Sequence, residues 1–222
     1  LILTGGLYTA VGVANRAAGV SWDPAVLAWE AALFGGQPSF DWIRAQPWPW
    51  LSFLLHAAYG SYYFILAASP LGLWLTGRHA AARRALRLTM SAFYACYLAF
   101  LVFPVAGPRY VLPAVANEAR QVLPARLVHG ILEGGSAWGT AFPSSHVAAG
   151  LAAAAAAWLG WRALGAVLLP LAALMSIGTV YGQFHYAVDA LAGAAIAAVL
   201  VGLDLRRSRP RPAAAEAPGP PA

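Results

Sequence analysis

Long apolar segments separated by short polar ones run along most of the chain, and this pattern predicts membrane-spanning helices. A helix needs about 20 predominantly apolar residues to cross the hydrocarbon core of a bilayer. Five segments are close to that length, whereas the first is interrupted by glycines and by Asn15 and Arg16. We therefore expect an all-α fold, a polytopic membrane helical bundle of about six transmembrane helices. The predicted spans are residues 1–20, 50–76, 88–105, 143–161, 163–181 and 185–205.

The amino-acid composition favours the same class and excludes several others. Of the 222 residues, 60% are hydrophobic and 10% are charged, whereas soluble domains carry roughly 25% charged residues. So apolar a chain is neither a soluble globule nor, over most of its length, a disordered protein. Its single cysteine, Cys96, excludes a disulfide scaffold.

All fourteen basic residues are arginines, and their placement predicts the orientation of the spans. They lie at the ends of apolar segments, which favours membrane topology over a nucleic-acid partner. By the positive-inside rule, the face with more arginines in short loops is cytoplasmic. With six spans, that face carries Arg78, Arg83, Arg84, Arg87, Arg162, Arg206, Arg207, Arg209 and Arg211, and the opposite face carries Arg44, Arg109, Arg120 and Arg126.

This topology predicts one domain and one tail. We expect residues 1–207 to form a single multi-pass domain of the cell membrane, with any active site on the extracytoplasmic face. Residues 208–222 are rich in proline and alanine, which predicts a disordered cytoplasmic tail. In the outer loops we expect an interfacial helix over residues 25–34 and an amphipathic segment over residues 122–132 that covers the site.

Two polar clusters at the outer ends of spans suit an anion. Prolines end the third span and present Arg109 at the interface, where a guanidinium binds phosphate oxygens in pairs or snorkels to lipid headgroups. Pro143, Ser144 and Ser145 predict the N-terminus of the fourth helix, where unpaired N–H groups attract an anion. His146 follows in the first turn, placed to give or take a proton. The alternative is a serine cap beside an incidental histidine.

A third cluster precedes the sixth span and contains a histidine and an aspartate. His185 and Asp189 are four residues apart, so a helix would place both on one face. A carboxylate one turn away fixes the imidazole tautomer and raises its nucleophilicity. A structural His–Asp pair is the alternative, although burying such a pair brings little stability. Tyr181 and Gln183 lie just before this pair in the sequence.

Together the three clusters form a set suited to phosphoryl transfer: an anion cradle, a histidine nucleophile held by an aspartate, and a second histidine as acid. A zinc site is a rival use of the two histidines and Asp189, but their spacing suits it poorly. We therefore expect no metal and no cofactor. Separately, His56, Tyr59 and Tyr63 share one face of the second span, and either line a headgroup pocket or form a buried hydrogen-bonded group.

These motifs resemble those of the type 2 phosphatidic acid phosphatase superfamily, over about residues 50 to 205. That family has the motifs Lys-x6-Arg-Pro, Pro-Ser-Gly-His and Ser-Arg-x5-His-x3-Asp. Residues 143–146 (Pro-Ser-Ser-His) match the second motif, with Ser145 in place of glycine. His185 and Asp189 match the core of the third motif, and Gly193 follows them as it often does in the family.

The chain also departs from the family pattern. The lysine of the first motif falls at Val102, the arginine of the third falls at Thr179, and Arg109 follows a proline instead of preceding one. A Gly-Pro-Arg turn with His-Tyr-x-x-Asp and no preceding arginine is more similar to the inositol phosphorylceramide synthase branch. Those relatives transfer a phospho-headgroup between lipids, as the similar sphingomyelin synthases do.

The resemblance implies an integral membrane lipid phosphatase that forms a phosphohistidine on His185, with Asp189 orienting the ring. His146 would protonate the leaving oxygen and then activate water. A lipid headgroup phosphotransferase with the same histidine chemistry is the alternative, and a non-catalytic binding or transport protein is a second. The expected partners are a lipid phosphate and the bilayer, with no nucleic acid and no obligate protein partner.

The expected phosphate ligands are one arginine, two serines and several neutral donors. Arg109 and the helix N-terminus at Ser144 and Ser145 would hold the phosphoryl oxygens. Because the family's other two cations are absent at their usual positions, neutral side chains near the site are expected to help. These neutral candidates are Gln183, Tyr181 and Tyr110.

Overall fold

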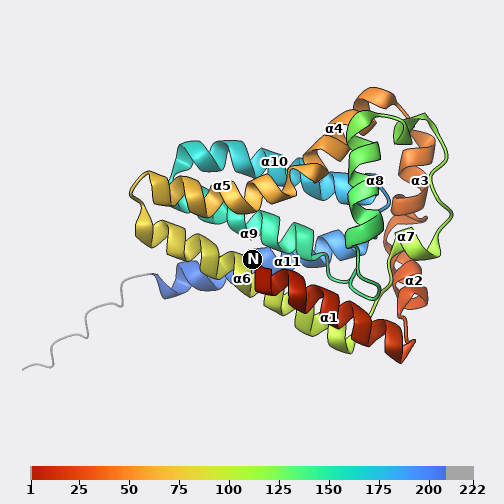
Figure 1. Ribbon diagram of the computed structural model, residues 1–222, viewed down its shortest axis with the longest axis horizontal. Coiled ribbons are helices and arrows are strands. Elements are labelled where there is room, and N and C mark those ends of the chain that lie inside the picture. The colour runs from red at the N-terminus through yellow and green to blue at the C-terminus, as the bar shows by residue number, and fades with distance from the viewer. Residues whose placement is uncertain (1, 209–222) are drawn as a thin grey trace, which may run out of the picture.

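The computed structural model describes residues 2–208, and within that range all regular secondary structure is helical (Figure 1). This confirms the predicted all-α class. The helices are α1 (Ile2–Ala18), α2 (Asp23–Phe34), α3 (Pro38–Ala45), α4 (Pro49–Gly60), α5 (Tyr62–Leu75), α6 (His79–Val102), α7 (Pro108–Val111), the 3-10 helix η1 (Glu118–Arg120), α8 (Leu123–Gly135), α9 (Ser145–Gly160), α10 (Arg162–Tyr181) and α11 (Ala187–Arg207).

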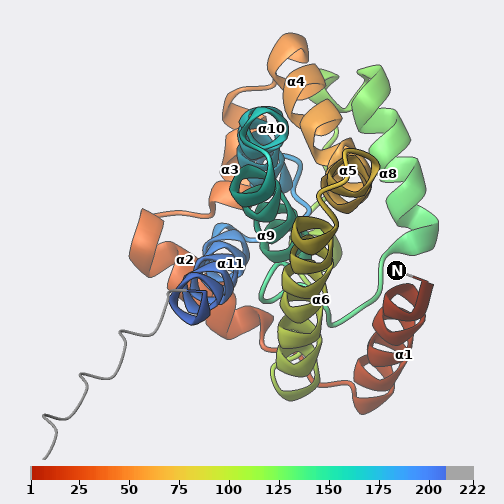
Figure 2. The ribbon, with the colours of Figure 1, turned by 90° about the vertical axis from the view of Figure 1, so that its left-hand side faces the viewer.

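Helix α9 lies at the centre of the bundle and packs against α5, α6, α10 and α11 (Figure 2). Its sequence explains this position, because seven of its alanines are completely buried. Small side chains let neighbouring backbones approach closely, which is how helices associate inside membranes. The seven are Ala148, Ala149, Ala152, Ala153, Ala154, Ala156 and Ala157.

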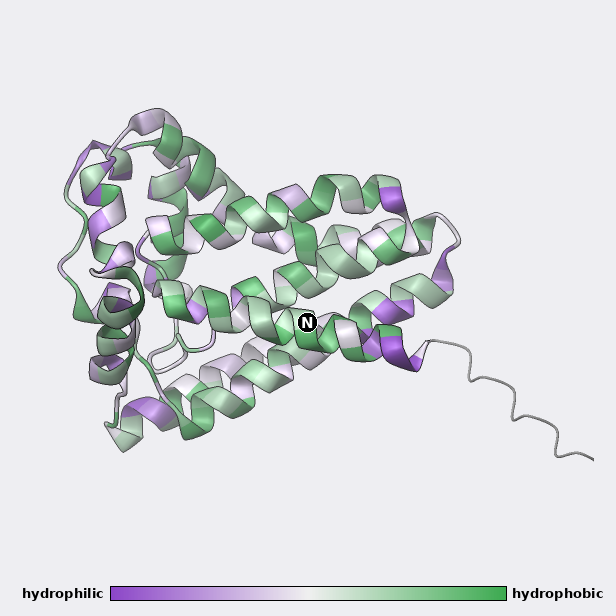
Figure 3. Ribbon diagram, turned by 180° about the vertical axis from the view of Figure 1, so that it is seen from behind, coloured by the Kyte–Doolittle hydropathy of each residue, from purple (hydrophilic) through white to green (hydrophobic). Residues whose placement is uncertain are grey.

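Three helices, α6, α10 and α11, are long and apolar enough to cross a membrane. The pair α4 and α5 adds a fourth if the two count as one bent span, and α9 is a shorter apolar helix of 16 residues. Most residues of the helices between the two ends of the bundle are hydrophobic, as their green colour in Figure 3 shows. The molecule is thus a helical bundle of the membrane type, and the count of six spans stays a prediction.

Two predicted spans differ from the helices observed. Residues 50–76 are not one straight helix, because α4 and α5 meet at Ser61 with a bend of 45°. The span predicted over residues 88–105 begins earlier, at His79, because the preceding alanines and arginines are strong helix formers. Arg84 and Arg87 of this extension form ion pairs with Asp204 of α11, which fixes it to the bundle.

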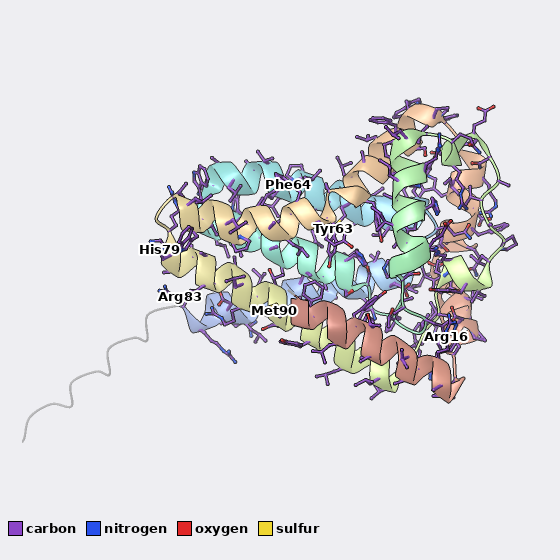
Figure 4. The ribbon with its side chains drawn as sticks, in the orientation of Figure 1. Arg16, Tyr63, Phe64, His79, Arg83 and Met90 are labelled. Atoms are coloured by element: carbon purple, nitrogen blue, oxygen red, sulfur yellow. The ribbon has the colours of Figure 1, made fainter. Side chains whose placement is uncertain are left out.

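The two ends of the bundle differ in structure. One end carries the α5–α6 and α9–α10 turns and the end of α11, and Figure 4 shows His79 and Arg83 there. The other end is covered by α2, α3, α7 and α8 (Figure 1). Helix α2 includes the helix predicted over residues 25–34, and α8 includes residues 123–132 of the predicted amphipathic segment. The predicted tail, with Arg209 and Arg211, lies outside the described residues apart from Ser208.

Candidate active site

The three polar clusters meet at one pocket in the covered end of the bundle. Arg109 comes from α7, His146 from the first turn of α9, and His185 from the turn before α11, and all three line this pocket. The centroids of the two imidazole rings are 5.7 Å apart. The sequence separation of these residues shows that only the tertiary fold brings them together.

His185 is buried and held at one ring nitrogen by two acceptors. His185 lies in the turn before α11, so it approaches Asp189 from that turn and not, as expected, from the same helix face. Its Nδ1 lies 3.1 Å from the carbonyl oxygen of Ala141 and 3.4 Å from Oδ2 of Asp189. Both neighbours favour a hydrogen on Nδ1, which leaves the lone pair on Nε2. Burial lowers the pKa of His185 to about 4, so the ring is neutral near pH 7.

Asp189 holds the turn that carries His185. It is completely buried in the first turn of α11, and its Oδ2 accepts a hydrogen bond of 2.8 Å from the N–H of Tyr186. Its Oδ1 is buried without a hydrogen-bond partner among the described residues. Asp189 therefore caps its own helix while presenting a carboxylate to the imidazole.

His146 lies against two tyrosines, one on each side of the bend between α4 and α5. The ring of Tyr59, from the last turn of α4, stacks on His146 at 5.5 Å, and its hydroxyl lies 3.4 Å from Nε2. The ring of Tyr62, the first residue of α5, lies 4.3 Å from the imidazole. Tyr62 occupies the position next to His146, whereas Tyr63 is largely exposed. Of the predicted group of His56, Tyr59 and Tyr63, Tyr59 therefore lines the pocket and Tyr63 does not.

Ser144 and Ser145 are both buried at the start of α9, with different surroundings. The hydroxyl of Ser144 caps the helix by accepting from the N–H of Val147, and its own N–H donates to the carbonyl of Asp189. Ser145 lines a neighbouring groove instead of the pocket itself. The second motif therefore contributes to the pocket through His146 and the positive end of α9.

Arg109 is positioned by a turn that is tied to Asp23. The carboxylate of Asp23 accepts from the N–H groups of Ala106 and Gly107 at 2.7 and 2.8 Å, and from the hydroxyl of Tyr186 at 2.9 Å. Gly107 has a φ of +96°, which a residue with a side chain rarely adopts. Asp23 thereby links the turn of the first cluster to the third, and fixes Arg109 relative to His185.

Gln183 and Tyr181, both predicted to bind substrate, do not line this pocket. The amide of Gln183 accepts from Arg44 at 2.8 Å and donates to the carbonyl of Pro113 at 3.0 Å. The hydroxyl of Tyr181 donates to the carbonyl of Gln46 at 2.8 Å. Both side chains therefore connect outer segments to the end of α10. Tyr110, the third neutral candidate, does line the pocket.

Comparison with protein families agrees with this geometry. The model of the PAP2 superfamily matches residues 24–203, which include all three clusters and most of the bundle. The chain belongs to the PAP2 superfamily. Comparisons with curated proteins and with solved structures gave no match.

The two PAP2 cation positions that this chain lacks are structurally unsuited to bind phosphate here. Val102 is 79% exposed at the end of α6, and Thr179 is fully buried, with its hydroxyl bonded to Ser176. Among residues 2–208, Arg109 is the only arginine lining the pocket. Hydroxyl groups line much of the rest: Tyr8, Tyr59, Tyr110, Ser136 and Thr140.

Asp23 and Glu30, two acids of α2, support the site although neither belongs to a recognisable sequence motif. Glu30 is completely buried, and its carboxylate accepts from the N–H groups of Ala187 and Val188 at the start of α11. Burial raises the pKa of the Glu30 carboxyl, while these two N–H groups oppose that rise. The N-terminus of α11 is thus filled by the protein itself, whereas that of α9 faces the pocket. In the sequence, Glu30 stands out only as an acid within the otherwise apolar residues 25–34.

A larger groove meets the pocket on the side of α1 and α5. Its volume is about 420 Å³, and it shares Tyr8, Leu132 and His146 with the pocket. Phe93, Leu66 and Ile131 add apolar surface along it. Figure 4 shows Tyr63, another lining residue, at the opening between α5 and α8. The groove therefore extends from His146 along α1, α5 and α6.

Proposed function

We propose that this PAP2 protein is a lipid phosphatase that cleaves a phosphate ester or anhydride through His185, without metal. The observation that carries the proposal is the convergence of His185, His146 and Arg109 on one pocket. A nucleophile, a proton donor and a guanidinium for the phosphoryl oxygens are the parts such a reaction needs. The family makes phosphatase or phosphotransferase chemistry the natural use of this set.

In the first step, Nε2 of His185 attacks phosphorus and the bond from phosphorus to the ester oxygen breaks. The bound phosphate anion favours the protonated form of His146, which then gives its proton to the leaving oxygen, so the lipid departs as an alcohol. The ring of His185 becomes positive, and its Nδ1–H faces the Ala141 carbonyl and the Asp189 carboxylate. Those two acceptors stabilise the charge that develops.

In the second step, water attacks phosphorus and the bond from phosphorus to Nε2 breaks. His146, now neutral, takes the proton from water, and inorganic phosphate leaves with His185 restored. Throughout, Arg109 and the positive end of α9 hold the phosphoryl oxygens. Asp189 acts as a positioning residue, because it contacts the histidine and not the substrate.

The groove beside the pocket supports a lipid as the substrate. Its volume of about 420 Å³ accommodates the first part of a hydrocarbon chain. Because it meets the pocket at His146, a chain lying there places its headgroup next to both histidines. The expected location is the cell membrane, with the site on the extracytoplasmic side.

Headgroup transfer to a lipid alcohol is the second candidate. The replacement of the motif arginine by buried Thr179 and the His185-Tyr186 pair favour it, since both features are similar to the inositol phosphorylceramide synthase branch. The chemistry on His185 is the same, and only the acceptor of the second step changes from water to a lipid hydroxyl.

Phosphate release from defined lipids tests the proposal. The purified protein in detergent is given phosphatidic acid or a prenyl diphosphate, with a chelator present. We expect release in the wild type and its loss to background in His185→Ala. His79→Ala is the matched control, because His79 is exposed at the opposite end of the bundle (Figure 4) and its variant should keep full activity.

The outcomes separate the candidates. Release that persists in His185→Ala would overturn the assigned nucleophile, and release that stops with the chelator would overturn the metal-free mechanism. No release, together with a labelled product when a lipid alcohol is added, would replace hydrolysis by headgroup transfer. If the wild type, like His185→Ala, gave neither phosphate nor a labelled lipid product, with or without the lipid alcohol, a non-catalytic role would be favoured.

A further inference from the structure

A second polar cavity lies beside the catalytic pocket, under α8 and η1. Its volume is about 150 Å³, and Arg109 lines both it and the pocket. The two spaces therefore meet at this one guanidinium. The residues around the cavity are Arg109, Ala114, Val115, Arg120, His129 and Gln183, and none of these six is an aspartate or glutamate.

Two residues that line the cavity each have a buried side-chain nitrogen without a partner among the described residues. His129 is 8% exposed, and its Nε2 has no hydrogen-bond partner within the described part of the chain. The same holds for Nη1 of Arg109 over residues 2–208. Burying a polar group without a partner is unfavourable, and native proteins satisfy nearly all such groups. A ligand with oxygen acceptors would satisfy both.

The positive charges around the cavity also favour binding of an anion. Arg109 and Arg120 are two positive groups facing one space, and the ion pair that Arg120 forms with Glu133 is long, at 3.7 Å. Burial and the neighbouring arginines lower the pKa of His129 to about 3, so its imidazole is neutral near pH 7 and serves as a hydrogen-bond donor. Two guanidinium groups without a lining carboxylate are typical of phosphate-type binding sites.

Gln183 lines this cavity and uses its side-chain amide to hydrogen-bond the segments around it. Its amide oxygen accepts from Arg44, and its amide nitrogen donates to the carbonyls of Pro108 in α7 and of Pro113 in the segment after α7. These bonds hold the segment with Ala114 in place, so the cavity is a built feature of the outer cover. They also explain why Gln183 has a φ of +59° between Gly182 and Phe184.

We propose that this cavity binds a second anionic group of the substrate, held by Arg120 and His129 and bridged to the reacting phosphoryl group by Arg109. The substrate class is then a lipid whose headgroup carries two adjacent phosphate-type anions. The lipid groove meets the pocket at Tyr8, Leu132 and His146, away from this cavity, so the chain and the second anion do not compete. The inference deepens the proposed function and relies on it for the reacting group.

Direct binding of two soluble probes tests this subsite without any turnover. Methylenediphosphonate carries two anionic groups joined by a stable carbon bridge, and methylphosphonate carries one. Calorimetric titration of the purified wild type should show the diphosphonate binding about tenfold or more tightly than the phosphonate, because each added charged contact is worth about that factor. In Arg120→Gln and in His129→Gln this preference should fall to about twofold or less.

Arg126→Gln is the matched control, since Arg126 is an exposed arginine six residues further along that does not line the cavity. It should keep the full preference, which separates a local contact from a general loss of positive charge. Equal affinities of the wild type for both probes, or an unchanged preference in both Arg120→Gln and His129→Gln, would overturn the subsite. His129→Gln decides if Arg120→Gln fails to fold. Because no catalysis is measured, the result stands apart from the fate of the phosphatase proposal.

Discussion

His185 has two acceptors at Nδ1, and this duplication determines how the histidine responds to mutation. The carbonyl of Ala141 is the nearer one, at 3.1 Å, and the carboxylate of Asp189 lies at 3.4 Å. A carbonyl alone fixes the tautomer, whereas only a carboxylate offsets a full positive charge on the ring. Tautomer and charge stabilisation are therefore supplied by different groups.

Asp189→Asn separates these two contributions. We expect kcat to fall about 10- to 100-fold, because the Ala141 carbonyl still holds the tautomer while the compensating charge is gone. KM should change less than about twofold, since Asp189 does not contact the substrate. The measurement is steady-state phosphate release beside His185→Ala. A loss as complete as in His185→Ala, or no loss in kcat, would contradict this division of roles.

For single residues, the sequence predicted the side chains that line the pocket better than the side chains that hold them in position. His146, His185 and Arg109 were found because polar residues at the ends of apolar spans are conspicuous, and all three line the pocket. Asp23 and Glu30 were not found, because a carboxylate that binds backbone N–H groups leaves no side-chain motif. Tyr181 and Gln183 were near in sequence, but their hydrogen bonds direct them to outer segments.

At the scale of helices, the site depends on how closely α11 approaches the start of α9. A Cβ built on Gly193 of α11 would lie 2.4 Å from the carbonyl oxygen of Ser144 and 3.2 Å from the N–H nitrogen of Ala148. Both are backbone atoms, so neither can rotate away. The contact explains in physical terms why a glycine follows the third motif here.

Gly193→Ala should therefore destabilise the protein and impair the site. We expect a loss of about 1–3 kcal/mol in unfolding free energy and reduced turnover, because Ser144 and the N-terminus of α9 must move. Gly202→Ala is the control on the same helix, where a Cβ meets nothing within 4 Å, and it should gain up to about 1 kcal/mol. Denaturant unfolding in detergent gives both values. Equal stability of the two variants would refute the close-contact argument.

The bend between α4 and α5 shows where element-level prediction failed. Residues on both sides of Ser61 are apolar, so the hydropathy pattern predicted one span, although the Gly60-Ser61 pair is a typical site for a helix kink. Tyr59 and Tyr62, one on each side of the break, both contact the ring of His146. The start of α11 was likewise expected two residues early, so that His185 belongs to a turn. Helix boundaries at a functional site depend on tertiary contacts that periodicity does not contain.

For the whole molecule, the long apolar segments predicted most helices of the bundle, whereas the count of six spans stays a prediction. The predicted spans correspond to α1, the pair α4 and α5, α6, α9, α10 and α11. The sequence predicted two segments of the outer cover, residues 25–34 and 122–132, but not the hydrogen bonds that hold α2, α3, α7 and α8 over the site. That cover contains the second cavity, which joins residues far apart in the chain.

The orientation of the molecule in the membrane is the remaining prediction at this scale. Seven described arginines lie at the end opposite the pocket, so the positive-inside rule places that end in the cytoplasm and the pocket outside. A substrate in the outer leaflet would then reach the groove directly. The seven are Arg78, Arg83, Arg84, Arg87, Arg162, Arg206 and Arg207.

Cysteine labelling in intact cells decides the orientation. The native Cys96 is completely buried, so it should give little background. Glu118 is exposed near the pocket and Arg83 is exposed at the other end. An impermeant maleimide should label the Glu118→Cys variant in intact cells and the Arg83→Cys variant only after permeabilisation. The reverse pattern would place the site in the cytoplasm, and its lipid would then have to come from the inner leaflet.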